Sequence, residues 1–279
     1  MLKSKFYKLF SGFYEQYLIP IVFMALTPIV FYENMPEAVI ALLAIILGTL
    51  ADISINRVYD AEDDAIEDWK REKNPISNGQ VDKDRAWMFC VNMYFVSIIL
   101  SLLTGKIIFA FALTIRNLFG FLYSGPPVRA KAHAFIDILF HITIIDSGPA
   151  FLAIMYTKNI GSIALYMLGF LVLNSIFTQI SQEIRDLNID RKAGLNTTAQ
   201  KLGMRKSSIL QKFLLISMCL YVIITSAYTR MFYVIVAGAI ATLYVLTKMG
   251  GEHVTIHRAR KKYLLLIILG VVIQILVML

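Results

Sequence analysis

Long apolar segments fill most of this chain and limit the folds that are open to it. Of its 279 residues, 58% are hydrophobic, against about 45–50% in soluble domains. Each segment is close to the ~20 residues that an α-helix needs to cross the core of a bilayer. Only helices and closed barrels satisfy the backbone in lipid, so these continuous runs predict membrane-spanning helices. The nine predicted spans are residues 17–33, 37–56, 86–104, 107–123, 133–155, 160–181, 208–227, 231–247 and 263–279.

The basic residues are distributed unevenly between the loops. Most of the 27 Lys and Arg residues lie at the amino terminus or in the loops after the even-numbered spans, whereas the other loops carry only Lys106, Lys158 and Arg230. The positive-inside rule therefore places the amino terminus and the long loops in the cytoplasm. We expect an integral protein of the cell membrane, whose net charge of +8 sets topology and contacts lipid rather than nucleic acid.

One amide followed by two carboxylates occurs twice, each time at the end of an apolar segment. The first copy is Asn56, Asp60 and Asp64, and the second is Gln182, Asp186 and Asp190. At steps of four, the side chains of each copy form a column on one face of a helix. Mg²⁺ is usually held by one or two carboxylates together with phosphate oxygens and waters. Two such columns at the cytoplasmic rim of an apolar bundle predict a site where Mg²⁺ holds a diphosphate.

The two columns end the second and the sixth predicted spans, which implies four spans per repeat. We therefore expect a single membrane-embedded domain with repeat halves at roughly 1–132 and 133–262, followed by a ninth helix at 263–279. Both columns run in the same direction along the chain. The repeat would thus be parallel, about an axis near the membrane normal.

A diphosphate site also needs cations, and the loops beside the columns supply them. Arg and Lys bind phosphate through charge-assisted hydrogen bonds. The candidates are Lys70, Arg71, Lys73, Arg129, Lys131, Arg191 and Lys192. In the segment from Tyr123 to Lys131, Pro126 and Pro127 restrict the backbone. We expect this turn to present Arg129 and Lys131 from a fixed position.

Asp137 and His141 lie four residues apart inside the predicted fifth span, hence on one helical face. Ionisable residues within a membrane are costly and usually face a cavity or a partner. The two side chains could line a pocket for an acceptor or serve as a base. Equally, they could form a structural pair with Arg116 or lie nearer the membrane surface.

These motifs together resemble the UbiA superfamily of intramembrane prenyltransferases. Its first motif, N-D-x-x-D-x-x-x-D, is matched from Asn56 to Asp64, except that Arg57 replaces the second-position Asp. Its second motif, D-x-x-x-D, is matched from Asp186 to Asp190. Two further stretches are similar to family segments: residues 73–79 to a basic-Pro-Ser-Gly stretch, and Tyr123-Ser-Gly-Pro-Pro-Val-Arg129-Ala-Lys131 to a Y-S-x-P-P-x-R-x-K turn.

The resemblance implies an all-α bundle around a central cavity with a cytoplasmic cap. It implies Mg²⁺-dependent transfer of a polyprenyl group from a polyprenyl diphosphate to a lipophilic or aromatic acceptor, with release of diphosphate. Two Mg²⁺ ions would be held by Asp60, Asp64, Asp186 and Asp190, which would thereby be the catalytic residues. Asn56, Gln182, Tyr123 and the basic residues named above would bind substrate, and the motifs leave the acceptor open.

Other classes of membrane protein share parts of this pattern. A transporter can also carry internal repeats and buried acids, but it predicts helices broken at mid-membrane, and no pair of interrupted spans is evident. A CDP-alcohol phosphatidyltransferase also uses carboxylates four apart at a membrane surface, but its D-G-x-x-A-R stretch is absent from this sequence. A non-catalytic scaffold would leave the two columns without a role. These readings remain the alternatives to prenyl transfer.

Overall fold

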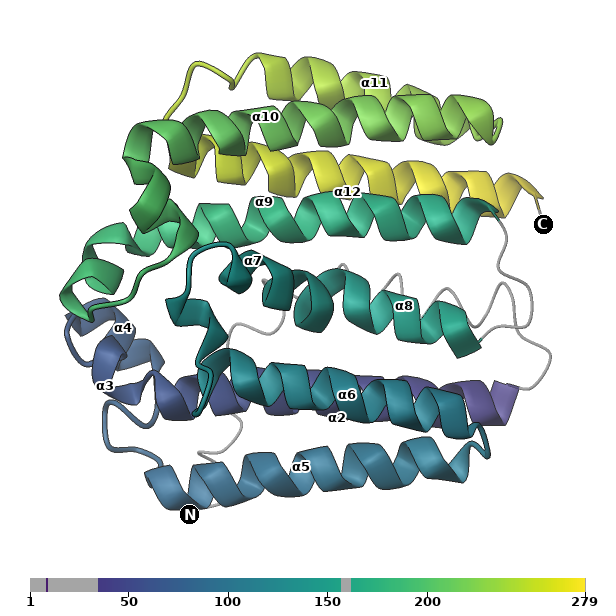
Figure 1. The fold of residues 1–279 in the computed structure, drawn as a ribbon. Helices are drawn as coiled ribbons and strands as arrows, with labels where there is room; N and C mark the ends of the chain where they lie inside the picture. Colours follow the sequence, from purple (N-terminus) through teal and green to yellow (C-terminus); the bar gives the residue numbers. More distant parts are fainter. Residues whose placement is uncertain (1–8, 10–34, 157–161, 279) are drawn as a thin grey trace.

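The computed structural model describes Leu9 and residues 35–156 and 162–278. The regular structure of this part is helical (Figure 1), which confirms the all-α class. The long helices are α2 (Met35–Tyr59), α5 (Lys83–Leu103), α6 (Ile107–Ser124), α9 (Ser162–Lys192), α10 (Thr198–Tyr228), α11 (Phe232–Leu246) and α12 (His253–Met278). The shorter ones are α3 (Ala61–Asp64), α4 (Asp68–Lys73), the 3-10 turn η3 (Ala130–Ala132), α7 (Ile136–His141), the π-helical η4 (Ile142–Asp146) and α8 (Ser147–Tyr156).

Of the predicted spans from the second onward, each corresponds to one of these helices except the fifth, which is divided between α7, η4 and α8. The first, residues 17–33, lies outside the described residues. Four described helices are long and apolar enough to cross a membrane: Pro36–Tyr59, Lys83–Leu103, Ile107–Ser124 and Thr198–Tyr228. The pair Ile136–Ile145 and Ser147–Met155 would form a fifth span, bent by 44°. Large apolar side chains on the outer faces, such as Phe111 and Ile224, remain exposed. The chain is thus an integral membrane protein of several spans.

Several helices extend beyond the apolar runs that predicted them. α9 continues to Lys192. α10 begins at Thr198, where the side chain of Thr197 accepts a hydrogen bond from the backbone N–H of Gln200 at 3.4 Å, and a kink at Gly203, with φ of 78°, separates this first turn from the rest of α10. Apolar length reports only the part of a helix that lies in lipid. Polar residues continue the same helix into water, and in α9 this polar extension carries the second column.

The fifth predicted span is not one straight helix. α7 and α8 are joined by the π-helical turn η4, and the two parts are bent by 44°. Pro149 follows the turn, and a proline within a helix removes a hydrogen bond and crowds the carbonyl four residues before it. Among the described helices this is the one bent pair of spans, so the paired interruptions typical of a transporter are not found in this part of the chain.

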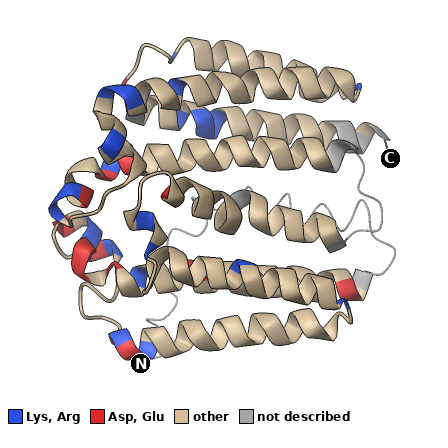
Figure 2. Cartoon of the chain, viewed as in Figure 1, with Lys and Arg blue, Asp and Glu red and all other residues tan. Residues whose placement is uncertain are grey.

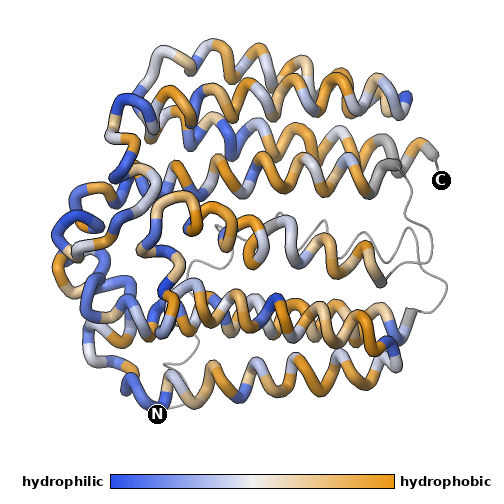
Figure 3. Tube along the Cα trace, viewed as in Figure 1, coloured by the Kyte–Doolittle hydropathy of each residue, from blue (hydrophilic) through white to orange (hydrophobic). Residues whose placement is uncertain are grey.

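The helices run side by side in two groups (Figure 1). α2 packs against α5 and α6, whereas α9 packs against α10, and α11 against α12. α8 lies between the groups and contacts α2, α6 and α9. Charged residues gather at the end of the bundle that holds α3 and α4 (Figure 2), and hydropathy falls at the same end (Figure 3). The division into two repeat halves stays a prediction.

A buried ion pair joins α2 to α6 in the apolar interior. Arg116 Nη1 lies 2.5 Å from Asp52 Oδ2, and the Tyr94 hydroxyl donates to Asp52 Oδ1 at 2.7 Å. The Arg116 guanidinium also donates to the backbone carbonyl of Ile144. Charges are tolerated at such depth when they are paired and hydrogen-bonded. The acidic partner of Arg116 is therefore Asp52, and neither Asp137 nor His141 forms the structural pair with Arg116 considered above.

This ion pair depends on a glycine. A Cβ at Gly120 would overlap the Asp52 carboxylate, which Tyr94 and Arg116 hold in place. We expect Gly120→Ala to destabilise the protein by about 1–3 kcal/mol through overpacking, seen as a lower midpoint of thermal unfolding in detergent. Gly250→Ala is the control, because nothing lies within 4 Å of its Cβ. Equal midpoints for the two variants would contradict this role of Gly120.

Candidate functional site

A cavity of about 530 Å³ opens at the charged end of the bundle. Its walls come mainly from the end of α2, from α3 and α4, and from the last turns of α9. The predicted site residues that line it are Asn56, Asp60, Asp64, Lys70, Lys73, Tyr123, Lys131, His141, Gln182, Asp186 and Asp190. The structure thus brings both columns to one cavity.

The first column continues across a helix junction. α2 ends at Tyr59 and α3 begins at Ala61, yet Asp60 keeps a right-handed helical conformation. The Asp60 N–H donates to the Asn56 carbonyl at 2.8 Å, and the Asp64 N–H donates to the Asp60 carbonyl at 2.7 Å. These i to i−4 bonds keep the three side chains on one face, as their spacing predicts. The second column lies wholly within α9, so the hydrogen bonds of that helix alone keep its side chains on one face.

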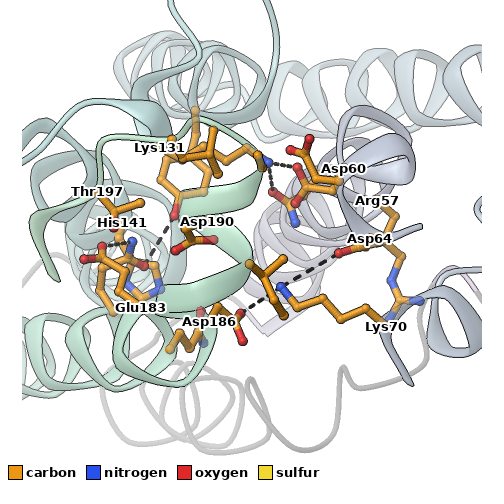
Figure 4. Close-up of a pocket in the computed structure, with 18 of the residues that line it drawn as sticks. Arg57, Asp60, Asp64, Lys70, Lys131, His141, Glu183, Asp186, Asp190 and Thr197 are labelled. Atoms are coloured by element: carbon orange, nitrogen blue, oxygen red, sulfur yellow. Dashed lines mark hydrogen bonds and ion pairs between the residues drawn. The ribbon is translucent and has the colours of Figure 1, made fainter. Parts of the chain in front are cut away.

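Two lysines neutralise the columns, and one of them touches both (Figure 4). Lys70 Nζ lies 3.1 Å from Asp186 Oδ2 and 4.0 Å from Asp64 Oδ1. Lys131 Nζ forms an ion pair with Asp60 and lies 3.4 Å from Asn56 Oδ1. Because a single ammonium reaches a carboxylate of each column, the columns are close enough to share one ligand.

Burial shifts the proton equilibria of these acids. It raises the pKa of Asp64, and burial together with the nearby charge of Asp186 raises the pKa of Asp190 to about 7. Burial also acts to raise the pKa of Asp186, but the hydrogen bonds from Arg185 and the charge of Lys70 outweigh it and hold the value below normal. Burial lowers the pKa of Lys131 to about 7, although Asp190 opposes the shift. The buried carboxylates therefore favour additional positive charge beside them.

The donor set suits Mg²⁺ bound together with a phosphate ligand. Within the described residues, no three His, Cys, Asp or Glu side chains converge as a ready-made metal cage. Mg²⁺ does not need one, because it keeps several waters and takes one or two carboxylates plus phosphate oxygens. Asp60 and Asp64 from one column, and Asp186 and Asp190 from the other, could provide those carboxylates on opposite walls of the cavity.

Sequence reasoning missed Asn74, which orients the first column. Its side-chain amide donates to Asp64 Oδ2 and to the Arg57 carbonyl, each at 2.9 Å, and its Oδ1 accepts from the Ile76 N–H at 3.1 Å. Asn74 falls within the stretch 73–79 that resembles a family segment. An asparagine before a proline in that stretch was the available signal, but nothing in the sequence paired it with Asp64.

Asp52 and Asp63 also line the cavity, although the sequence motifs do not name them as site residues. Asp52 lies one step of four before Asn56, so the column pattern already extended to it. Asp63 forms an ion pair with Arg129, which places the turn after α6 against α3. Arg129 itself adopts a left-handed conformation with φ of 46°, and it does not line the cavity.

Some predicted substrate-binding cations lie outside the cavity lining. Arg71 pairs with Asp68 at 2.5 Å, Lys192 Nζ lies 2.8 Å from Glu67 Oε1, and Arg191 is exposed. The Lys192 contact joins the end of α9 to the loop before α4. Arg129 and Lys192 thus join separate segments of the charged end, whereas the pair of Arg71 lies within α4.

The two predicted acceptor residues have different surroundings. Asp137 is fully buried away from the lining, and its carboxylate accepts hydrogen bonds from the N–H of Thr198 at 2.7 Å and from its hydroxyl at 2.6 Å. Asp137 therefore caps the start of α10. His141 does line the cavity, and its Nδ1 lies 2.8 Å from the Ser175 hydroxyl. Only His141 of the two is placed to meet a ligand.

Known proteins share both the sequence pattern and the fold of this chain. A model of the UbiA prenyltransferase family matches residues 17–275. A 2-acylphloroglucinol 4-prenyltransferase from Humulus lupulus is 26% identical over 193 residues, covering 64% of this chain and 44% of that protein. A digeranylgeranylglyceryl phosphate synthase from Pyrococcus horikoshii is 28% identical over 189 residues, covering 65% of this chain and 64% of that protein. The matches span less than two thirds of the length of these curated relatives.

Solved structures extend the likeness along almost the whole chain. A UbiA homologue from Archaeoglobus fulgidus, bound to DMAPP and Mg²⁺, matches with a TM-score of 0.65 and 18% identity. The match covers 98% of this chain and 97% of that one. At this identity the comparison establishes the fold, and the described bundle therefore has the fold of that homologue.

The contact between Asn74 and Asp64 gives a test of the site. In Asn74→Ala, Asp64 loses its orienting amide, so we expect Mg²⁺ with inorganic pyrophosphate to bind roughly tenfold more weakly, as for a lost hydrogen bond to a charged group. The measurement is the rise in unfolding midpoint that these ligands cause in detergent.

Asn78→Ala provides a matched control in the same loop. The Asn78 side chain donates to the Glu72 carbonyl at the end of α4 at 3.1 Å and accepts from the Gln80 N–H at 3.2 Å, and neither bond involves an aspartate of the columns. It should keep the wild-type response to the ligands. If both asparagine variants respond like the wild type, Asn74 does not orient a ligand-binding carboxylate.

Proposed function

The chain belongs to the UbiA prenyltransferase family, and on that premise we propose that it is a Mg²⁺-dependent intramembrane prenyltransferase. It transfers a polyprenyl group from an allylic polyprenyl diphosphate to a lipophilic or aromatic acceptor and releases diphosphate. The observation that carries this proposal is the single ammonium of Lys70, which lies between Asp64 of one column and Asp186 of the other. One diphosphate with its metal ions would occupy the same space.

The diphosphate end of the donor lies at the charged mouth of the cavity. Asp60 and Asp64 would hold one Mg²⁺ ion, and Asp186 and Asp190 would hold the other, with Asn56 and Gln182 able to supply neutral oxygens or hydrogen bonds. The binding of DMAPP and Mg²⁺ by the Archaeoglobus fulgidus homologue supports this assignment. Lys70, Lys73 and Lys131 line the same mouth and donate to the phosphate oxygens.

The reaction follows from these positions. The C1–O bond of the allylic donor breaks, its electron pair leaves with the diphosphate, and the acceptor's nucleophile bonds to C1 and loses a proton. When bound, Mg²⁺ neutralises the negative charge that develops on the departing diphosphate. The lysines of the mouth stabilise the same charge, while Ile53, Ile144 and Ile145 in the cavity lining limit the access of water to the allylic cation.

The acceptor binds in the same cavity, beside Tyr123, Gln179 and His141. Tyr123 and Gln179 line it and are joined by a hydrogen bond of 3.3 Å between the Tyr123 hydroxyl and Gln179 Oε1. His141 is the group that could orient a hydroxyl of the acceptor or take its proton. A mixed lining of amide, hydroxyl and imidazole fits an acceptor with a polar head and an apolar body.

The active-site end faces the cytoplasm in this proposal. The Lys and Arg residues gather at that end of the bundle (Figure 2), as the positive-inside rule expects of a cytoplasmic face. Soluble Mg²⁺ and diphosphate esters are available on this side. The distribution of charge and the place of the site therefore favour the same orientation.

Neutralising either column tests the function. We expect Asp60→Asn and Asp186→Asn each to lower prenyl transfer by about 10³-fold, since each removes a carboxylate that holds the metal and so costs several kcal/mol in the transition state. The assay follows labelled prenyl diphosphate into lipid products by mass spectrometry. Chelation of Mg²⁺ should abolish transfer in the wild type, and added Mg²⁺ should restore it.

Asp68→Asn is the control for removal of a nearby carboxylate. The side chain of Asp68 is 84% exposed and pairs with Arg71 outside the cavity lining, so its removal should leave transfer intact. Full activity in Asp60→Asn or Asp186→Asn, with the protein folded, would rule out the metal-holding role of the columns.

A further inference from the structure

Three cations surround one indole ring at the mouth of the cavity. Trp69 in α4 lines the cavity and is 41% exposed. Lys73 Nζ lies 5.3 Å from the ring centroid, Lys70 Nζ 5.7 Å, and the guanidinium carbon of Arg185 5.8 Å. All three distances fall within the ~6 Å range of a cation–π contact. Two of these cations come from α4, and the third comes from α9 on the opposite wall.

The three cations differ in their other partners. Lys70 and Arg185 both contact the Asp186 carboxylate, Arg185 through two hydrogen bonds of 2.8 and 2.9 Å. Lys73 differs, because within the described part of the chain no carboxylate lies in ion-pair distance of its ammonium. In the described residues, the negative face of the Trp69 indole is the group that the Lys73 ammonium contacts. A cation that lines a cavity in this way is available to an incoming anion.

The indole reduces the repulsion between neighbouring cations without adding the negative charge that a carboxylate would bring. Like charges gathered at one place repel one another, so they need a compensating group. A carboxylate would bind them tightly and would also repel an approaching diphosphate. The ring quadrupole attracts cations weakly at exposed sites, whereas phosphate oxygens form stronger charge-assisted hydrogen bonds with the same groups. Transfer of Lys73 from the ring to a diphosphate is therefore favourable. Lys70 and Arg185, which also contact Asp186, would exchange both the ring and that carboxylate for phosphate oxygens.

We propose that Trp69 is a positioning residue that holds Lys70, Lys73 and Arg185 at the mouth and releases them to the diphosphate of the donor. This inference rests on the proposed function and adds to it the residue that prepares the cations. Arg185, absent from the sequence-based list, joins the phosphate-binding groups. Trp69 does not touch the reacting carbon, so its contribution lies in recognition of the diphosphate.

The chain contains only two tryptophans, Trp69 and Trp87, which makes the release of the cations observable. In Trp87→Phe, Trp69 is the sole indole, and its emission reports the charges beside the ring. Titration with Mg²⁺ and inorganic pyrophosphate in phospholipid-free detergent should shift this emission. The shift should be half-maximal at the dissociation constant that radiolabelled pyrophosphate gives for the same variant.

The outcomes of this titration separate the inference from the proposed function. If labelled pyrophosphate binds but Trp69 emission does not change, the positioning role is overturned while the diphosphate site stands. If pyrophosphate does not bind at all, the positioning role of Trp69 and the proposed diphosphate site are both overturned. If emission responds to anionic phospholipid in nanodiscs and not to pyrophosphate, the three cations serve lipid headgroups, and the inference is overturned.

Donor kinetics provide the second readout. Trp69→Leu should raise the KM for the prenyl diphosphate about three- to tenfold, with kcat within about twofold, since cation–π contacts at exposed sites are individually weak. Trp69→Phe keeps an aromatic face and should recover much of the loss. Trp87→Leu is the matched control, because Trp87 is 39% exposed and its indole donates to the Tyr59 hydroxyl at 3.2 Å, away from the cavity lining.

A merely structural role of Trp69 would give a different pattern. Loss of folding would lower the unfolding midpoint and the amount of active enzyme, and therefore kcat, without a selective change in donor KM. An unchanged donor KM in Trp69→Leu, or an equal rise in Trp87→Leu, would overturn the proposal.

Discussion

The approach of two acidic helix ends across one cavity is the constraint on which the rest of this structure depends. Asp60, Asp64, Asp186 and Asp190 would repel one another if they faced an empty pocket. Lys70 and Lys131 compensate for them, and Lys70 does so for both columns at once. Buried carboxylates that favour added positive charge, and lysines that line the same cavity, fit the metal diphosphate that we propose for this site.

The bundle serves this site by fixing the helices that carry the columns. The buried pair of Asp52 and Arg116 holds α2 against α6, and the close approach at Gly120 leaves room for it. On the other wall, Asp137 caps α10 through Thr198. Ionisable residues inside the membrane thus have two roles here. Some hold helices in place, as Asp137 does, while others such as His141 face the cavity.

Periodicity made the helices and the columns predictable, because steps of four and apolar runs are local properties of the sequence. Contacts between distant segments were not accessible in the same way. Nothing in the sequence paired Asn74 with Asp64, or placed Arg185 and Lys73 on one indole ring. Asp137 and His141 share a helical face by spacing, yet one is a buried cap and the other lines the cavity. Only tertiary packing separates two such residues.

A crystal or cryo-EM structure with Mn²⁺ in place of Mg²⁺ and inorganic pyrophosphate tests the central claim most directly. Anomalous scattering, or density in a map, would locate the metal ions without reference to activity. The account predicts metal ions contacting aspartates of both columns, with pyrophosphate between them and Lys70 moved from Asp64 and Asp186 to the phosphate oxygens. Metal ions bound to one column alone, or pyrophosphate bound elsewhere while Lys70 still joins the columns, would contradict it.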